Sequence, residues 1–225
     1  MSVTYCYVAL LDVLSYRVRL QNDVQQGTYA FKDDLEDALS VFNDVNAAIY
    51  GVQAISDTII ITCKHHSDFP DLLSLLQSVF YAFLQRSLFV RGGVSYSRHF
   101  QSGRVTYSHA IARAYEIESN KAIYPRIVID NNIIDMYQSS RKRLPDITKK
   151  GYLLKQNGVH FVDVVSIDNW LSMYSTAKAM FEHDKSYLLN NESAFEKHRW
   201  FESLLMSSPH AIPGHPGYVT SIQPV

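Results

Sequence analysis

Two aspartates, Asp12 and Asp57, are the residues of this chain whose type and position best suit catalytic chemistry. Asp12 follows the apolar run 7–11, and Asp57 lies between the apolar stretches 54–55 and 59–61. A carboxylate at the end of a buried strand is unfavourable unless it is paired, hydrogen-bonded or bound to a cation. Two carboxylates about 4 Å apart repel by roughly 4 kcal/mol at an effective dielectric constant near 20, and a divalent cation removes that repulsion. Because Mg²⁺ favours one or two carboxylates together with phosphates, the pair predicts a metal–triphosphate site. Two aspartates that only cap turns at strand ends are the alternative interpretation.

The elements that would bring these aspartates together alternate between strands and helices. The predicted strands cover residues 3–11, 50–56, 58–64, 88–97 and 126–130, and the predicted helices cover residues 33–49, 67–85 and 108–118. This order is the β-α-β-β-α-β arrangement of a ferredoxin-like fold, followed by an extra helix–strand unit. The predicted fold class is therefore α+β, an α/β sandwich. Its hairpin over residues 50–64 places Asp57 at the tip, where it can meet Asp12 if the first strand is a neighbour.

The chain is predicted to divide into a core over residues 1–140 and a C-terminal part over residues 141–225. The regular alternation weakens after Asp130, and the basic, proline-containing segment 141–150 is typical of a linker. Beyond it, Asn157-Gly158 predicts the turn of a hairpin over residues 153–165. Helical spacing predicts helices over residues 170–190 and 193–205. The hairpin, these helices and an irregular tail from Pro209 are expected to pack on the core.

The composition predicts a cytoplasmic protein that binds neither nucleic acid nor membranes. The 225 residues are 47% hydrophobic and 19% charged, as in ordinary globular proteins, and the net charge of −1 gives no support for nucleic-acid binding. Cys6 and Cys63 are isolated in apolar runs, which favours reduced core cysteines over disulfides. No apolar run approaches the ~20 residues of a membrane helix. The N-terminus also lacks the pattern of a signal peptide.

Several segments of the chain, taken in order, resemble the catalytic domain of class III nucleotide cyclases. In that family an aspartate ends the first strand, a second aspartate lies in the hairpin, and an Arg-x-Gly strand follows. The nearer resemblance is to the Pycsar pyrimidine cyclases of bacterial antiphage defence, and it spans most of residues 3–205, with the core 1–140 as the cyclase-like part. The segments that carry the resemblance are Leu11-Asp12-Val13-Leu14-Ser15-Tyr16, Ile55-Ser56-Asp57, Arg91-Gly92-Gly93-Val94-Ser95, Ala114-Tyr115-Glu116-Ile117-Glu118, Ala122-Ile123-Tyr124-Pro125-Arg126-Ile127-Val128-Ile129 and Lys197-His198-Arg199-Trp200.

The resemblance implies that a ribonucleoside triphosphate, UTP or less favourably CTP, closes to its 3′,5′-cyclic monophosphate and releases pyrophosphate. The product would act as a second messenger on a cyclic-nucleotide-responsive effector in antiphage defence. Two ions per site, Mg²⁺ or Mn²⁺, are implied: one lowers the pKa of the attacking 3′-hydroxyl, and the other gathers the β- and γ-phosphates. Asp12, Asp57 and the carbonyl of Val13 match the family's metal ligands.

Further residues match the family's triphosphate-binding groups. The turn Leu14-Ser15-Tyr16 leads into a helix whose free N–H groups can hold phosphate, although family members often have Gly-Phe in place of Ser15-Tyr16. Arg91 matches the triphosphate-binding arginine, which suits bidentate contact with phosphate oxygens. A strand-edge arginine that pairs with a surface acid is the alternative for Arg91.

Base recognition and transition-state stabilisation are implied at three positions. Gln53 falls near the family's adenine-selecting lysine, and its amide can offer both a donor and an acceptor to a pyrimidine. Tyr50 could contact the base or be a core aromatic. The helix after the Arg-x-Gly strand has Ala112 and Glu116 where adenylate cyclases have Asn and Arg. Arg113 is therefore the candidate cation, with a solvated helix residue as the alternative.

Class III cyclases build each site between two head-to-tail chains, so the resemblance implies a homodimer with two equivalent composite sites and Arg113 reaching across. A catalytically silent cyclase-fold module that binds nucleotide and regulates a partner is the second hypothesis. The presence of Asp12, Asp57 and Arg91 favours the enzyme. A diguanylate-cyclase or polymerase-palm relative is a third hypothesis. It is disfavoured because the hairpin lacks a Gly-Gly-acidic turn and the chain lacks a basic surface for nucleic acid.

Overall fold

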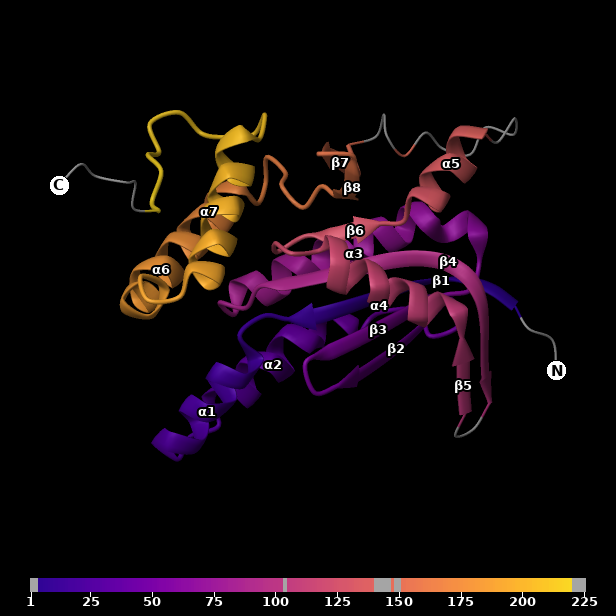
Figure 1. The fold of residues 1–225 in the computed structure, drawn as a ribbon, viewed down its shortest axis with the longest axis horizontal. Helices are drawn as coiled ribbons and strands as arrows, with labels where there is room; N and C mark the ends of the chain where they lie inside the picture. Colours follow the sequence, from indigo (N-terminus) through magenta and orange to yellow (C-terminus); the bar gives the residue numbers. More distant parts are fainter. Residues whose placement is uncertain (1–3, 103–104, 140–146, 148–150, 220–225) are drawn as a thin grey trace. The chain divides into compact units, whose positions relative to one another are not determined.

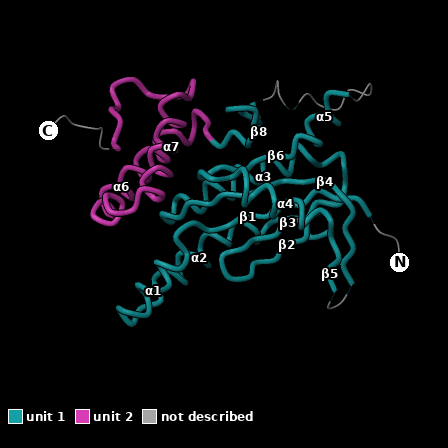
Figure 2. Tube along the Cα trace, in the orientation of Figure 1, with its two compact units in different colours: residues 1–164 teal, residues 165–225 magenta. Residues whose placement is uncertain are grey.

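The computed structural model describes residues 4–102, 105–139, 147 and 151–219 (Figure 1). The chain divides into two compact units, Met1–Val164 and Val165–Val225 (Figure 2). The first unit contains the predicted site residues, and its framework is a sheet. The second unit consists of two helices, α6 (Trp170–Leu188) and α7 (Glu192–Ser207), and an extended tail.

Eight strands of the described chain form one mixed sheet in the first unit. They are β1 (Thr4–Val13), β2 (Tyr50–Ile55), β3 (Thr58–Cys63), β4 (Val90–Ser102), β5 (Val105–Ser108), β6 (Ile127–Ile129), β7 (Leu153–Gln156) and β8 (Val159–Val162). Their order is β2-β3-β1-β4-β6-β8-β7, with β5 paired to β4. β1 runs antiparallel to β3 and β4, and β6 runs parallel to β4. The α+β class and the ferredoxin-like element order are confirmed.

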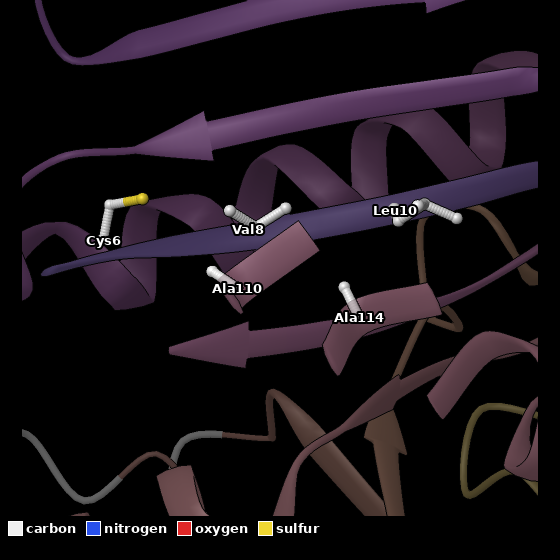
Figure 3. Close-up of a cluster of buried hydrophobic side chains, with 5 residues drawn as sticks. All are labelled: Cys6, Val8, Leu10, Ala110 and Ala114. Atoms are coloured by element: carbon white, nitrogen blue, oxygen red, sulfur yellow. The ribbon is translucent and has the colours of Figure 1, made fainter. Parts of the chain in front are cut away.

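β1 is an interior strand, between β3 and β4, and is buried on both faces, which explains its continuous apolar run. On one face, Cys6, Val8 and Leu10 pack against Ala110 and Ala114 of α4 (His109–Lys121) (Figure 3). On the other face, the ring of Tyr7 stacks on Phe69, at the start of α3 (Phe69–Gln85), with 4.5 Å between ring centroids. Because side chains alternate along a strand, Asp12 lies on the α4 face.

The Gly92-Gly93 pair in β4 allows unusually close packing on both sides. A Cβ atom on Gly92 would lie 2.5 Å from the carbonyl oxygen of Leu10. A Cβ atom on Gly93 would lie 2.4 Å from the carbonyl oxygen of Ala114 and 2.9 Å from the backbone nitrogen of Glu118. Glycine is therefore required where α4 crosses β4, and this approach brings the C-terminal half of α4 down onto the sheet.

The predicted helix over residues 33–49 is wrong at both ends. The structure has α1 (Tyr16–Gln26), α2 (Ala30–Leu39) and a short 3₁₀ helix (Ser40–Phe42) in this region. No residue of α1 is buried, and its largely polar sequence has only a narrow apolar stripe, at Tyr16, Leu20 and Val24. The other elements that were not predicted are β5, the 3₁₀ turn His66–Asp68 and α5 (Asn131–Ser139).

The predicted hairpin turn at Asn157-Gly158 is confirmed. Both residues have positive φ, 51° and 78°, as a two-residue hairpin turn requires. Because β8 pairs with β6, this hairpin extends the core sheet, and the compact units divide after Val164. The segment 141–150, predicted as a basic linker, lies outside the described residues except for Ile147. No helix of the described chain is both long and apolar enough to cross a membrane.

Candidate active site

Asp12 and Arg91 face each other at one end of the sheet. They are register partners on β1 and β4, and Arg91 Nε donates to Asp12 Oδ2 over 3.0 Å. The two side chains are 24% and 25% exposed, so solvent and small ligands can reach the pair. The carboxylate and the guanidinium thus lie together on the α4 face, although they are 79 positions apart in sequence.

The Ser56-Asp57 turn closes the β2–β3 hairpin beside the end of β1. The carbonyl oxygen of Asp57 accepts a hydrogen bond of 2.9 Å from the N–H of Val13. This bond joins the turn to the residue that follows Asp12 in β1. The predicted meeting of the hairpin tip with the end of the first strand is therefore confirmed at the backbone. The half-buried side chain of Asp57 belongs to the same end of the sheet as Asp12.

Glu118 of α4 is a third carboxylate at this end, and it was not among the predicted site residues. Its Oε1 atom lies 2.6 Å from Arg91 Nη2, and its side chain is only 5% exposed. Burial raises the pKa of Glu118, the charge of Arg91 and a hydrogen bond from Ser119 oppose that rise, and the negative charges of Asp12 and Asp57 add to it. The carboxyl groups of Asp12, Asp57 and Glu118 therefore interact electrostatically with one another beside the guanidinium of Arg91.

A sequence signal for Glu118 exists in the pattern of α4. The buried residues of this helix are Ala110, Ala114, Ile117 and Glu118, which is the i, i+4, i+7, i+8 stripe of a helix face turned to a core. An acid at the last position of such a stripe must find a cation. Its partner, Arg91, is visible only after the strand register and the helix docking are known.

The residues at this end of the sheet fit a divalent cation that is bound together with phosphate. Across the described chain, no group of three or more His, Cys, Asp and Glu side chains is arranged to hold a metal. Two carboxylates are nevertheless sufficient for Mg²⁺ when a substrate supplies phosphate oxygens. The carboxylates of Asp12 and Asp57 are hard oxygen donors of this kind, and the backbone N–H of Val13 donates to the carbonyl oxygen of Asp57. The excess of carboxylates over the single guanidinium favours a cation there.

The predicted phosphate-binding turn has an unusual backbone conformation. Ser15 precedes α1 with φ of 64° and ψ of 15°, and its side chain caps no helix N–H. This left-handed region suits glycine, which the resemblance places here, and a serine adopts it at some energetic cost. The N–H of Leu14 donates to the carbonyl of Phe89 over 2.9 Å. Phosphate binding by this turn would therefore fall to the first N–H groups of α1, which begins at Tyr16.

The two predicted base-binding residues lie on opposite faces of β2. Gln53 pairs in register with Ile60, which packs against the Cys6–Val8–Leu10 cluster, so Gln53 shares the face of Asp12. Tyr50 is three positions away and points to the other face. Burial, and to a lesser extent the nearby Cys63, raises the pKa of Tyr50 to about 12. The register therefore brings Gln53, and not Tyr50, to the face of the candidate site.

Arg113 is bound to a buried aspartate. Its Nε and Nη2 atoms donate to the carboxylate of Asp130 over 2.8 and 3.2 Å, and its Nη1 atom donates to Glu116 over 3.1 Å. The Asp130 side chain is 4% exposed and that of Arg113 is 41% exposed. These hydrogen bonds raise the pKa of Arg113. Arg113 lies five positions before Glu118, on a different side of α4, so this chain does not bring it to Asp12 and Arg91.

The comparison with solved structures finds cyclase domains that are similar to this chain at low identity. The guanylate cyclase domain of RhGC from Catenaria anguillulae, solved with GTP, is 13% identical over 72% of this chain and 98% of that chain, with a TM-score of 0.46. The adenylyl cyclase CyaB from P. aeruginosa is 10% identical over 74% and 98%, with a TM-score of 0.45. The guanylyl cyclase domain of RhoGC from Blastocladiella emersonii is 13% identical over 71% and 95%, with a TM-score of 0.45. No family profile and no curated protein matches the sequence.

Proposed function

We propose that this protein is a nucleotidyl cyclase that converts a pyrimidine ribonucleoside triphosphate, UTP in preference to CTP, to its 3′,5′-cyclic monophosphate and pyrophosphate. The observation that carries the proposal is the pairing of Asp12 with Arg91 beside the turn that carries Asp57. A metal-binding carboxylate and a phosphate-binding cation are thereby adjacent, as the motif resemblance implies. The choice of a pyrimidine, and a product that signals to an effector in antiphage defence, follow from the resemblance.

The chain's own groups have distinct roles in this proposal. Asp12 and Asp57, with the carbonyl of Val13, hold two Mg²⁺ or Mn²⁺ ions, and Arg91 binds the triphosphate. Bound divalent ions lower the pKa of the 3′-hydroxyl and neutralise charge on the phosphates. Arg91 suits the triphosphate because a guanidinium can donate two parallel hydrogen bonds to phosphate oxygens.

The direct test is incubation of the protein with each of the four ribonucleoside triphosphates and Mn²⁺ or Mg²⁺, with products identified by mass spectrometry. We expect UTP to give cyclic UMP and an equal amount of pyrophosphate, with slower turnover of CTP. The matched control is 3′-deoxy-UTP, which lacks the attacking hydroxyl and should give no cyclic product. Nucleotide binding without any cyclic product would favour the silent regulatory module.

We expect Gln53 to contribute to the choice of base. Gln53→Ala should change the ratios of kcat/KM among UTP, CTP and ATP by about tenfold or more, because a site built around a hydrogen bond rejects the wrong partner strongly. The same variant should change triphosphate affinity much less. Tyr50→Phe probes the opposite face of β2 and should alter these ratios less than Gln53→Ala. The reverse order of effects would transfer base recognition to Tyr50.

Homodimerisation is part of the proposal. Each active site would combine the aspartates of one chain with the α4 helix of its partner, and Arg113 would supply the cation that stabilises developing phosphoryl charge. Asp130 holds two of the guanidinium nitrogens, which orients the third, Nη1, toward the exposed Glu116. Arg113 could exchange the exposed carboxylate of Glu116 for a phosphate of the substrate that is bound to the partner chain. This exchange costs little free energy, because exposed ion pairs contribute only about 0–1 kcal/mol.

A further inference from the structure

Arg91 is held from two sides by carboxylates of unequal exposure. Its Nε atom donates to Asp12, its Nη2 atom lies 2.6 Å from Glu118 Oε1, and its Nη1 atom donates to the carbonyl oxygen of Ala122 over 3.5 Å. Asp12 is 24% exposed, whereas Glu118 is 5% exposed. The guanidinium therefore spans the gap between the end of β1 and the C-terminal end of α4. Asp12 is its accessible partner and Glu118 its buried one.

The position of Glu118 is itself closely determined. The missing side chain at Gly93 lets the backbone of α4 approach β4 at the turn that carries Glu118. The hydroxyl of Ser119 donates to the second carboxylate oxygen of Glu118 over 3.0 Å. Both carboxylate oxygens of Glu118 are therefore in contact with other groups, and its helix packs closely against the sheet. Glu118 can thus hold Arg91 in a defined position.

We propose that Glu118 is the positioning residue that keeps Arg91 directed at the triphosphate, an inference that rests on the proposed function. A divalent cation on Asp12 would weaken the attraction of this carboxylate for the guanidinium, because the two cations would share one negative charge. When Asp12 turns to the cation, Glu118 is the carboxylate that retains Arg91 at the site. Without Glu118, the guanidinium would depend on Asp12, the carboxylate that the cation also needs.

The positioning role and simple electrostatics predict opposite effects on triphosphate binding when Glu118 is removed. A negative charge at Glu118 repels a triphosphate, so by charge alone its removal should strengthen triphosphate binding. As a positioning residue for Arg91, Glu118 should instead favour binding, and its removal should weaken it. The two effects can be separated by removing Arg91, because only the repulsion then remains.

The test is isothermal titration calorimetry with inorganic tripolyphosphate and Mg²⁺, which requires neither turnover nor a particular base. We expect Glu118→Gln to weaken tripolyphosphate binding by about tenfold, within the range typical of residues in direct contact. In the Arg91→Ala background, the same substitution should leave binding unchanged or strengthen it. Glu36→Gln is the matched control, since it removes the same charge from an exposed position of α2, where Glu36 pairs with Lys32, and it should bind within about twofold of wild type.

Thermal melting followed by circular dichroism verifies that each variant is folded. Glu118→Asp keeps the charge but retracts the carboxylate by one methylene, so it should also weaken binding, and it replaces the Gln variant if that variant is unfolded. Wild-type affinity in Glu118→Gln and Glu118→Asp, or an equal loss in both Arg91 backgrounds, overturns the positioning role. If wild-type protein with Mg²⁺ does not bind tripolyphosphate, the proposed triphosphate site fails, and this inference fails with it.

Discussion

Asp57→Ala or Asp12→Ala should abolish cyclisation while the protein remains folded. Loss of a metal-binding carboxylate should lower kcat by about a thousandfold or more, because bound metal contributes several kcal/mol to the stabilisation of transition-state charge. Neither side chain belongs to the apolar core, and Arg91 keeps Glu118 as a partner when Asp12 is removed. Pyrophosphate release measures the rate, and thermal melting measures the folding.

Asp44→Ala is the matched control for these two variants. Asp44 is an exposed aspartate in the turn region before β2, and its replacement should leave the rate within about twofold of wild type, as is usual for surface substitutions. Wild-type activity in either Asp12→Ala or Asp57→Ala would exclude the two-metal mechanism. A folded, inactive variant at both positions, with an active Asp44→Ala, is the result we expect.

Mixed dimers of Asp57→Ala chains and Arg113→Ala chains should recover up to half of the wild-type activity per dimer. Each variant alone should be inactive or nearly so. In a mixed dimer, one composite site combines the intact aspartates of one chain with the intact Arg113 of the other, and the second site carries both substitutions. An arginine that acts on transition-state charge should affect kcat more than nucleotide binding.

Folding must be controlled in this experiment, because Arg113→Ala leaves the buried carboxylate of Asp130 without its guanidinium partner. That loss should destabilise the chain by about 1–3 kcal/mol, less than for a fully buried pair because Arg113 is partly exposed. Arg113→Lys retains a charge near Asp130 and serves as a second variant. Arg199→Ala removes an exposed arginine that pairs with Glu196 in the same i,i+3 pattern, and it should behave as wild type.

Two outcomes would contradict the composite site. If size measurements show mixed dimers and the mixture remains inactive, Arg113 does not act in trans. If the wild-type protein is active as a monomer, each site lies within one chain.

The inner strands of the sheet, and the strand end and hairpin turn at which Asp12 and Asp57 lie, could be predicted from local residue patterns. The run that forms β1 is apolar because both of its faces are buried, so its pattern is strong and local. The turn at Asn157-Gly158 was predictable because few residues tolerate two successive positive φ angles. In contrast, α1 has no buried residue, and β5 is largely exposed along its length. Apolar residues of these elements, such as Leu20, Val24, Val105 and Tyr107, are exposed, so their pattern is short and gives only a weak signal in the sequence.

The contacts between side chains at the candidate site depend on tertiary packing and could not be predicted from local residue patterns. The register of β1 against β4 brings Arg91 to Asp12, and the glycine contact between β4 and α4 brings Glu118 to Arg91. Because side chains alternate along β2, Gln53 and Tyr50 lie on opposite faces of the sheet. The register of β2 against β3 decides that Gln53 shares the face of Asp12. These pairings depend on backbone hydrogen bonds and helix packing between segments that are distant in the chain, and local residue patterns do not encode such contacts.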